Sequence, residues 1–376
     1  MTSRLFSPIE IGGMQLHNRI ACSPMCQYSA DDGSATDWHL QHWMMLAMSG
    51  AGMVTAEATG VERRGRITHS CLGLYSDNNE AAAARALAAA RRVARPGTRF
   101  GIQLAHAGRK ASTLLPWQGG RPLGQGEDAW TTVAPSAIAY ADGWHVPEAL
   151  DRDGIATVTA AFVQAARRAE RAGFDYVEIH GAHGYLLHEF LSPLANRRDD
   201  EYGGPLDNRM RLMIEVAHAV RAALPPAMVV GARLSATDWV EGGFYPDEAV
   251  IVARALREAG VAFVCASSGG LSPSQKVTMT AGYQVPFAER IRREAGLASR
   301  AVGLITEPAL AETIVAEGRA DLIALGRAIL ADPRWPWRAA ALLGAKFYPP
   351  AQYLRAVPSI EASVAAPAEA RRSAAA

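Results

Sequence analysis

The sequence lacks the features that mark several large classes of protein. Its four cysteines form no C-x-x-C pair, which argues against a zinc ribbon or an Fe–S cluster. No apolar run is long enough to span a bilayer, and the N-terminal MTSRLFSPIEIGG lacks the apolar core of a signal peptide. The formal net charge is +1 and no basic stripe follows a helix face, so we expect no nucleic-acid or membrane partner. These absences predict a globular, cytoplasmic protein.

The order of the elements predicts one fold class. Short β-rich runs alternate with longer stretches of helical period, which is typical of βα units around a parallel sheet. The eight expected strands are Asn18–Cys22, Met53–Thr59, Phe100–Ala105, Phe174–His180, Val229–Ser235, Phe263–Ser267, Ala301–Ile305 and Asp321–Leu325. Eight regular units, and no G-x-G-x-x-G after the first strand, favour a closed (β/α)8 TIM barrel over an open doubly wound sheet.

We expect a single domain over residues 1–360. The segment 5–15, with its Gly12-Gly13 turn, predicts an N-terminal hairpin that plugs the bottom of the barrel. The longest insertion, residues 111–150 after the third strand, is rich in Gly, Pro and Trp, which indicates an ordered lid over the barrel mouth. Residues 361–376 are Ala-rich with few large apolar side chains, so we expect a disordered tail.

The sequence EIHGAHGYLLHEFLSP, residues 178–193, follows the fourth expected strand. The apolar strand ends in His180, and His183 and Tyr185 come before the next helical pattern. Active sites of such barrels lie at the C-terminal strand ends. Each imidazole can donate an N–H and the phenol can give up a proton, so the three could grip and protonate one polarised oxygen. A metal pair, with Glu178 or His188 as further ligands, and packed structural histidines are the alternatives.

The remaining strand ends carry other polar and glycine residues. Glycine beside arginine at the last strands is typical of a phosphate site in this fold, because backbone N–H groups can surround an anion there. The strand-end residues are Ser23 to Tyr28, Glu57 to Thr59, Gln103, His106, Arg233, Ser267 to Gly270, Gly303, Gly326 and Arg327.

Together these residues resemble the old yellow enzyme family of flavin-dependent ene-reductases, in its thermophilic-like or xenobiotic reductase-like branch. The resemblance is collinear over roughly residues 4 to 355. The motifs that carry it are SPMCQYSA (23–30), ATDWHLQH (35–42), QLAHAGRKAS (103–112), HGAHGYLLHEFLSP (180–193), NRRDDEYGG (196–204) and LIALGRAILADP (322–333). It implies a non-covalent FMN at the barrel mouth, reduced by NADPH or NADH, and an activated C=C bond as the acceptor.

The resemblance also implies which residues bind the cofactor. Backbone around the first two strand ends would line the flavin ring, Gln103 would meet the pyrimidine edge, and Arg233 would stabilise negative charge on reduced flavin. The full implied set is Ser23, Pro24, Met25, Cys26, Ala58, Gln103, His180, Arg233, Gly303, Gly326 and Arg327, the last three for the phosphate. No metal is implied.

The implied catalytic roles fall on the cluster after the fourth strand. His180 and His183 would bind the carbonyl, nitro or nicotinamide-amide oxygen, and Tyr185 would protonate the α-carbon. Cys26 would tune the flavin, and Tyr28 would hydrogen-bond the substrate.

The same branch uses a C-terminal segment that reaches the neighbouring subunit. Residues 349–355 resemble that segment, with Arg355 as the intruding side chain of a homodimer or homotetramer.

Two other functions remain open from the residues alone. A metal- or Lys-dependent barrel lyase or hydrolase would share the fold, although no lysine lies at a strand end. A larger flavoprotein of the dienoyl-CoA reductase type would need an Fe–S cluster and a second nucleotide domain.

Overall fold

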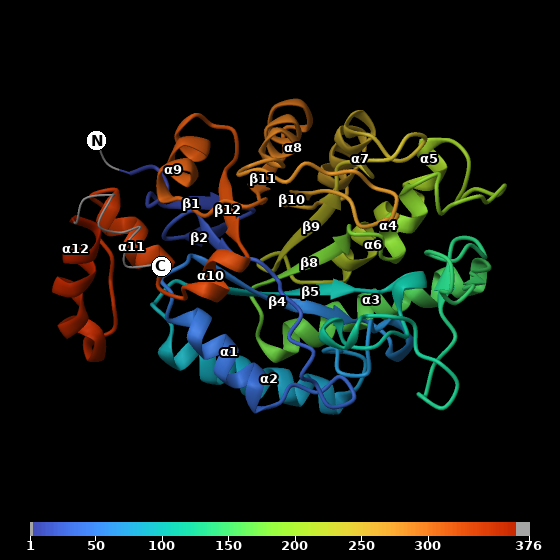
Figure 1. The fold of residues 1–376 in the computed structure, drawn as a ribbon, viewed down its shortest axis with the longest axis horizontal. Coiled ribbons are helices and arrows are strands. Elements are labelled where there is room, and N and C mark those ends of the chain that lie inside the picture. The colour runs from blue at the N-terminus through green and yellow to red at the C-terminus, as the bar shows by residue number, and fades with distance from the viewer. Residues whose placement is uncertain (1–2, 366–376) are drawn as a thin grey trace.

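A closed barrel of eight parallel strands forms the centre of the protein, as predicted. The computed structural model describes residues 3–365 (Figure 1). Around the barrel, each strand pairs with the next in chain order and the last closes on the first. The strands are β3 (Ile20–Cys22), β4 (Met53–Gly60), β5 (Arg99–Ala105), β8 (Tyr176–Gly181), β9 (Val229–Ser235), β10 (Phe263–Ser267), β11 (Ala298–Ala301) and β12 (Leu322–Leu325).

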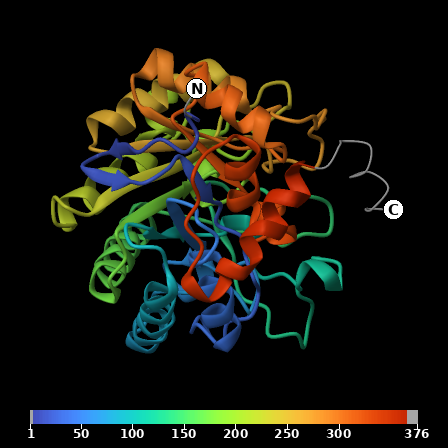
Figure 2. The same ribbon diagram turned by 90° about the vertical axis from the view of Figure 1, so that its left-hand side faces the viewer.

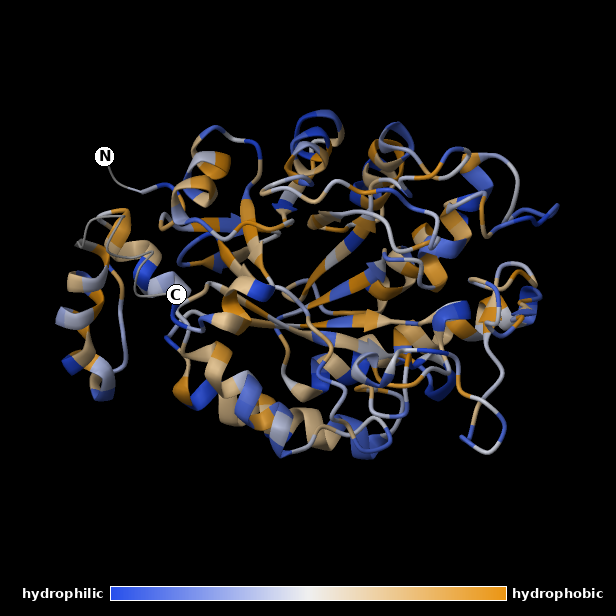
Figure 3. Ribbon diagram, in the orientation of Figure 1, coloured by the Kyte–Doolittle hydropathy of each residue, from blue (hydrophilic) through white to orange (hydrophobic). Residues whose placement is uncertain are grey.

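Helices surround the barrel, and the longer ones among them bury one face. The apolar colour of Figure 3 is concentrated at the strands and on the helix faces turned toward them. The helices are α1 (Asp37–Ala47), α2 (Asp77–Val93), α3 (Arg152–Ala172), α4 (Leu186–Leu191), α5 (Leu206–Arg209), α6 (Arg211–Ala223), α7 (Pro246–Glu258), α8 (Val285–Arg290), α9 (Pro308–Ala316), α10 (Arg327–Ala331), α11 (Trp335–Leu342) and α12 (Val357–Ala365). None of the helices in residues 3–365 has the length and apolar character required to cross a membrane.

Helix α3 shows how the local sequence sets these elements. Ile155, Val158 and Phe162 recur at helical spacing and are buried, so they form a stripe that faces the barrel. The Asp151 carboxylate accepts a hydrogen bond from the Gly154 N–H, which caps the first turn. Gly173 ends the helix with φ 94°, a left-handed conformation that favours glycine.

The N-terminal hairpin pairs β1 (Ile9–Ile11) with β2 (Met14–Leu16). Its buried Ile11, Met14 and Leu16 share one apolar cluster with inward-facing residues of the barrel, including Met53 and Tyr176. These barrel residues lie at the beginnings of their strands, so the hairpin covers the end opposite the strand C-termini. Figure 2 shows the blue hairpin and the red C-terminal segment facing the viewer at this end.

The insertion 111–150 is ordered and carries the short helix η3 (Pro116–Gln118) and two paired strands, β6 (Val133–Ala134) and β7 (Glu148–Ala149). Trp117 in η3 packs edge-on against Tyr28, with ring centroids 5.7 Å apart. The insertion therefore touches a predicted substrate residue, and its action as a lid is part of the proposal below.

The seventh barrel strand lies earlier than its predicted range. Strand β11 spans Ala298–Ala301, whereas the sequence predicts Ala301–Ile305. The sequence pattern misleads here because Arg300, a charged residue, points into the barrel interior and is 0% exposed. The apolar run that follows contains Gly303 and Leu304 with φ values of 117° and 51°, so it cannot continue a strand.

The C-terminal segment differs from expectation in one respect and places Arg355 in a defined element. Residues 361–365, predicted as part of a disordered tail, continue helix α12 instead, because α12 packs against α11; residues 366–376 lie outside the described residues. The exposed Arg355 lies in η5 (Ala351–Ala356). Neighbouring residues 348–353 pack against the C-terminal ends of α1 and α2, which places Arg355 far from its own strand C-termini.

Candidate functional site

A cavity of about 430 Å³ opens at the C-terminal ends of β9 to β12. The structure brings together here the predicted His183, Arg233, Gly303, Gly326 and Arg327. The strand-end residues Ser267, Ser268 and Gly270 and further residues without a predicted role complete the wall. They are Lys110, Ser267, Ser268, Gly270, Gln275, Tyr283, Gln284, Val302, Leu304, Ile305, Thr306, Ala324 and Ala328.

The His/His/Tyr cluster is compact and lies beside this cavity. The His180 ring centroid is 5.1 Å from that of His183 and 5.1 Å from that of Tyr185, both edge-on. His180 is the inward-facing residue next to the end of β8. His183, with φ 61°, lies in the turn that reverses the chain before α4. Tyr185 is the N-cap of α4. The strand end and the turn thus bring the two imidazoles and the phenol close together, as the sequence predicts.

Hydrogen bonds orient the two imidazoles. The Nδ1 atom of His180 accepts the Ala182 N–H at 3.3 Å, so its proton is on Nε2. The Nε2 atom of His183 lies 2.7 Å from Ser267 Oγ, and its backbone N–H donates to Ser235 Oγ at 2.9 Å. Burial, followed by the charge of Arg233, holds the pKa values of both histidines well below the ordinary value. Both are therefore neutral at pH 7, and each carries one N–H.

Lys110 ties the His183 turn to the loop after β10. Its Nζ donates to the carbonyl oxygens of His183 and Gly270, each at 2.9 Å. The two loops touch backbone to backbone, because a Cβ on Gly184 would lie 2.2 Å from the Gly270 oxygen. Burial lowers the pKa of Lys110 to about 8. Lys110 does not lie at the end of a strand, so the sequence gives no reason to place it in the site. Only its contacts in the structure do so.

The segment after β3 forms the opposite wall. The Gln27 N–H donates to Glu57 Oε2 at 2.8 Å, which fixes the chain beside Cys26 and Tyr28. Burial raises the pKa of the Cys26 thiol and of the Tyr28 phenol, so both are protonated at neutral pH. Ala58, on β4, lines a small hollow together with Tyr185. These two predicted site residues therefore lie close to each other.

Unpartnered polar groups in the site fit the predicted flavin mononucleotide. Within residues 3–365, neither Arg233 nor Arg327 forms an ion pair, and the buried Arg233 Nε and Ser23 Oγ have no hydrogen-bond partner. A buried guanidinium without an anion is costly. A pyrimidine carbonyl and a phosphate are the acceptors that such groups need. A Cβ on Gly326 would be in ordinary van der Waals contact with Met25 Sδ at 3.8 Å and Ser23 Cβ at 4.0 Å, so the predicted Ser23–Met25 strand end borders the same space.

Gln103 lies in the barrel interior below this site. Its Nε2 donates to Glu178 Oε1 at 2.7 Å, a contact that the sequence does not predict.

Glu178 and His188, the further ligands considered for a metal site, form ion pairs with other side chains. Glu178 pairs with Arg300, and His188 Nε2 lies 2.9 Å from Asp238 Oδ1. Across the described part of the chain, no three His, Cys, Asp or Glu side chains are grouped to hold a metal ion. His39, in turn, closes the capping box of α1.

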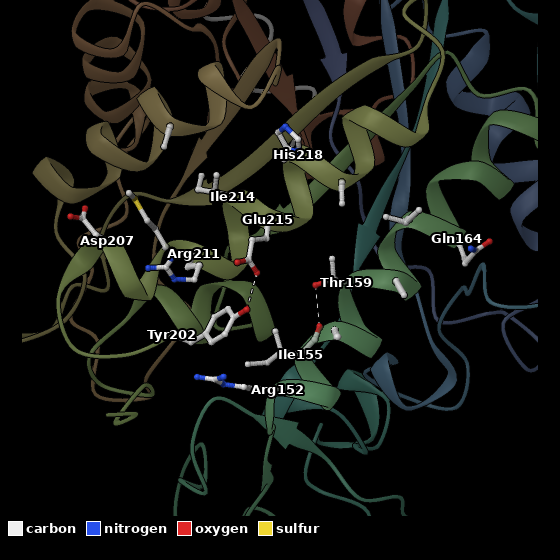
Figure 4. Close-up of a pocket in the computed structure, with 16 residues that line it drawn as sticks. Arg152, Ile155, Thr159, Gln164, Tyr202, Asp207, Arg211, Ile214, Glu215 and His218 are labelled. Carbon is white, nitrogen blue, oxygen red and sulfur yellow. Dashed lines mark hydrogen bonds between the residues drawn. The ribbon is translucent and has the colours of Figure 1, made fainter. Parts of the chain in front are cut away.

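A further groove lies outside the barrel, between α3 and α6 (Figure 4). Two of its polar side chains are bonded within the protein: Tyr202 donates to Glu215 at 3.0 Å (Figure 4), and Arg152 donates to Glu201 at 2.8 Å. No strand end reaches it, so we assign the chemistry to the barrel mouth.

Comparisons with known proteins agree with this geometry. The sequence pattern of the NADH:flavin oxidoreductase / NADH oxidase family matches residues 4–344. The NADPH dehydrogenase of Geobacillus sp. (strain WCH70) is 44% identical over 357 residues, 94% of this chain and 99% of that protein. That of Listeria innocua serovar 6a is 43% identical over 356 residues, with the same shares of 94% and 99%.

Two solved structures share the fold over most of both chains. Morphinone reductase superposes with a TM-score of 0.75 at 28% identity, over 96% of this chain and 93% of that chain. The old yellow enzyme homologue from Zymomonas mobilis superposes with a TM-score of 0.73 at 27% identity, over 92% of this chain and 94% of that chain.

Proposed function

The chain belongs to the NADH:flavin oxidoreductase / NADH oxidase family, as an FMN-dependent NAD(P)H oxidoreductase of the old yellow enzyme type, and we propose that it reduces activated C=C bonds. The acceptors would be α,β-unsaturated carbonyl or nitro compounds. The observation that carries this proposal is the grouping of two neutral imidazoles with a buried phenol at one strand end. The bound FMN supplies hydride chemistry, with NADPH or NADH as the reductant.

The two histidines would bind and polarise the acceptor oxygen. Among the residues that the structure describes, none accepts a hydrogen bond from the Nε2–H of His180, whereas its Nδ1 accepts one from the backbone. Neutral imidazoles donate without adding a charge that would compete with Arg233 for the flavin. Hydrogen bonds to an oxygen that gains negative charge strengthen as the reaction proceeds, and this lowers the barrier.

Tyr185 would supply the proton. Burial raises the pKa of its phenol well above the ordinary value, so the group holds its proton until a strong base forms beside it. The developing enolate of an enone is such a base, which makes a buried phenol a suitable acid. Tyr28 and Cys26, on the facing wall, would contact the substrate, and the insertion 111–150 would close over it through Trp117.

The cofactor contacts are proposed from the same positions. Arg233 and Gln103 would meet the pyrimidine, and His180 would lie beside it. Gly303, Gly326 and Arg327 would hold the phosphate. Backbone of Ser23, Pro24, Met25 and Cys26, with Ala58, would line the ring.

Colour provides the direct test of this function. We expect purified protein to be yellow and to bleach when NADPH is added without oxygen. Adding 2-cyclohexenone to the bleached protein, still without oxygen, should restore the yellow colour and produce the saturated ketone. A bleached protein that stays colourless with enones and nitroalkenes would contradict the proposed acceptor class.

We also propose a homodimer or homotetramer in which Arg355 enters a neighbouring site. Arg355 is exposed and lies at the end of the barrel opposite its own site, so it could meet substrate only in another subunit. Sedimentation velocity should show a dimer or tetramer, and Arg355→Ala should raise KM for enones several-fold with little change in flavin content. A monomer with full activity would refute this assembly.

A further inference from the structure

A buried ion pair in the middle of the barrel has no role in the function described so far. Glu178 on β8 and Arg300 on β11 are both 0% exposed, and the Arg300 guanidinium donates to Glu178 Oε2. Two buried charges are costly to desolvate, and apolar substitutes for such a pair are often neutral or stabilising. Stability therefore does not explain the pair.

The pair lies directly beneath the candidate site. Residues at alternate positions of β8 face inward: Tyr176 in the cluster with the hairpin, Glu178 next, and His180 at the mouth. Glu178 is thus about 7 Å along the strand from His180. On the neighbouring strand β5, Gln103 is its register partner, and the Gln103 Nε2 lies 2.7 Å from Glu178 Oε1.

This contact settles which way the Gln103 amide points. A carboxylate can only accept hydrogen bonds, whereas an amide offers NH₂ donors on one side and a carbonyl acceptor on the other. Gln103 must therefore turn its NH₂ group toward Glu178. Arg300 occupies the second oxygen of Glu178 and prevents the carboxylate from rotating away. The carbonyl oxygen of Gln103 is left to accept from a donor other than this pair.

We propose that Glu178 is a positioning residue, which fixes the Gln103 amide so that its carbonyl oxygen accepts the imide N–H of the FMN pyrimidine. This rests on the proposed placement of the pyrimidine beside Gln103. Arg300 serves to hold the carboxylate in place. The buried charges are retained because they select one of two amide orientations, and the wrong orientation would set an NH₂ group against the N–H of the cofactor.

The test replaces Glu178 by Gln in the full chain and measures the FMN dissociation constant by quenching of flavin fluorescence. A glutamine at 178 can donate as well as accept, so it permits both orientations of Gln103. We expect FMN to bind about tenfold more weakly, the value of one lost hydrogen bond to a partly charged group. Tyr176→Phe is the matched control, because it removes a buried hydroxyl from the same strand, bonded to Thr55 at 2.7 Å and not to Gln103. We expect it to bind FMN as the wild type does.

A second variant separates orientation from charge. Glu178→Gln combined with Arg300→Gln removes both charges, and we expect FMN binding to remain about tenfold weaker. Wild-type affinity in either the single or the double variant would overturn the proposal; recovery only in the double variant would mean that Glu178 merely neutralises Arg300.

The wild-type protein offers a measurement that does not depend on the folding of a variant. With ¹⁵N-labelled FMN bound, we expect the imide proton to appear at a hydrogen-bonded chemical shift in slow exchange with water. An imide proton that exchanges as in free FMN would overturn the proposal while leaving FMN binding itself established.

Discussion

Replacing Tyr185 by Phe should slow the reoxidation of the reduced flavin by 2-cyclohexenone by about 10²- to 10⁴-fold, the usual contribution of a general acid. The phenylalanine ring fills the same space beside His180, whose ring centroid is 5.1 Å from that of Tyr185. Only the transferable proton is lost. The measurement is anaerobic stopped-flow absorbance of the two half-reactions, followed separately.

The reduction of the flavin by NADPH is the internal control for this variant. That half-reaction needs no proton from Tyr185, so its rate should stay close to that of the wild type. Equal losses in both half-reactions would show that the substitution disturbs the site as a whole and that Tyr185 is not the acid. Full enone activity would assign the proton to another group, such as Tyr28 on the facing wall.

The double substitution His180→Ala with His183→Ala should reduce enone turnover by about 10²-fold or more, as expected for removing donors to a developing oxyanion. Binding of a phenol, which places its oxygen at the same donors, should weaken on the order of tenfold to a hundredfold. The flavin should remain bound, because Arg233, Gly326 and Arg327 are unchanged. Phenol titrations, read from the flavin absorbance band, give the dissociation constants.

His42→Ala is a matched control for this variant. His42 is buried on α1, and burial lowers its pKa to about 4, so it is a neutral histidine like the two in the site but lies outside the cavity. Its loss should leave phenol affinity unchanged. If the double variant still bound phenol and turned over enones normally, the two histidines would not be the oxygen-binding donors.

Much of the candidate site follows from the order of residues along the chain. In a parallel barrel, all strand C-termini meet at one end, so His180, Arg233 and Gly326 come together although they are far apart in sequence. Local chemistry then predicts their roles, since imidazole and guanidinium donors suit oxygen acceptors. The His183 turn was also predictable in outline, because small residues follow the strand before the next helix.

Three features could not be predicted in this way. The predicted range of β11 was wrong because a search for apolar residues does not detect a strand whose inward side chain, Arg300, is charged. Lys110 belongs to the site only through contacts with two distant loops, at His183 and Gly270. Helix α12 extends through residues predicted as disordered, because packing against α11 supplies contacts that composition does not reveal.

By itself, the sequence determined the barrel and the chemistry at its mouth, since both depend on periodicity and on residue types at strand ends. Only the tertiary structure decided the protonation of that chemistry and the orientation of its parts. Burial makes His180 and His183 neutral donors and keeps Tyr185 protonated, and a carboxylate 75 residues away in the sequence turns the amide of Gln103. The physical reason is that pKa values and hydrogen-bond direction depend on what surrounds a group in space, and the surroundings of a buried group come from many separate segments of the chain.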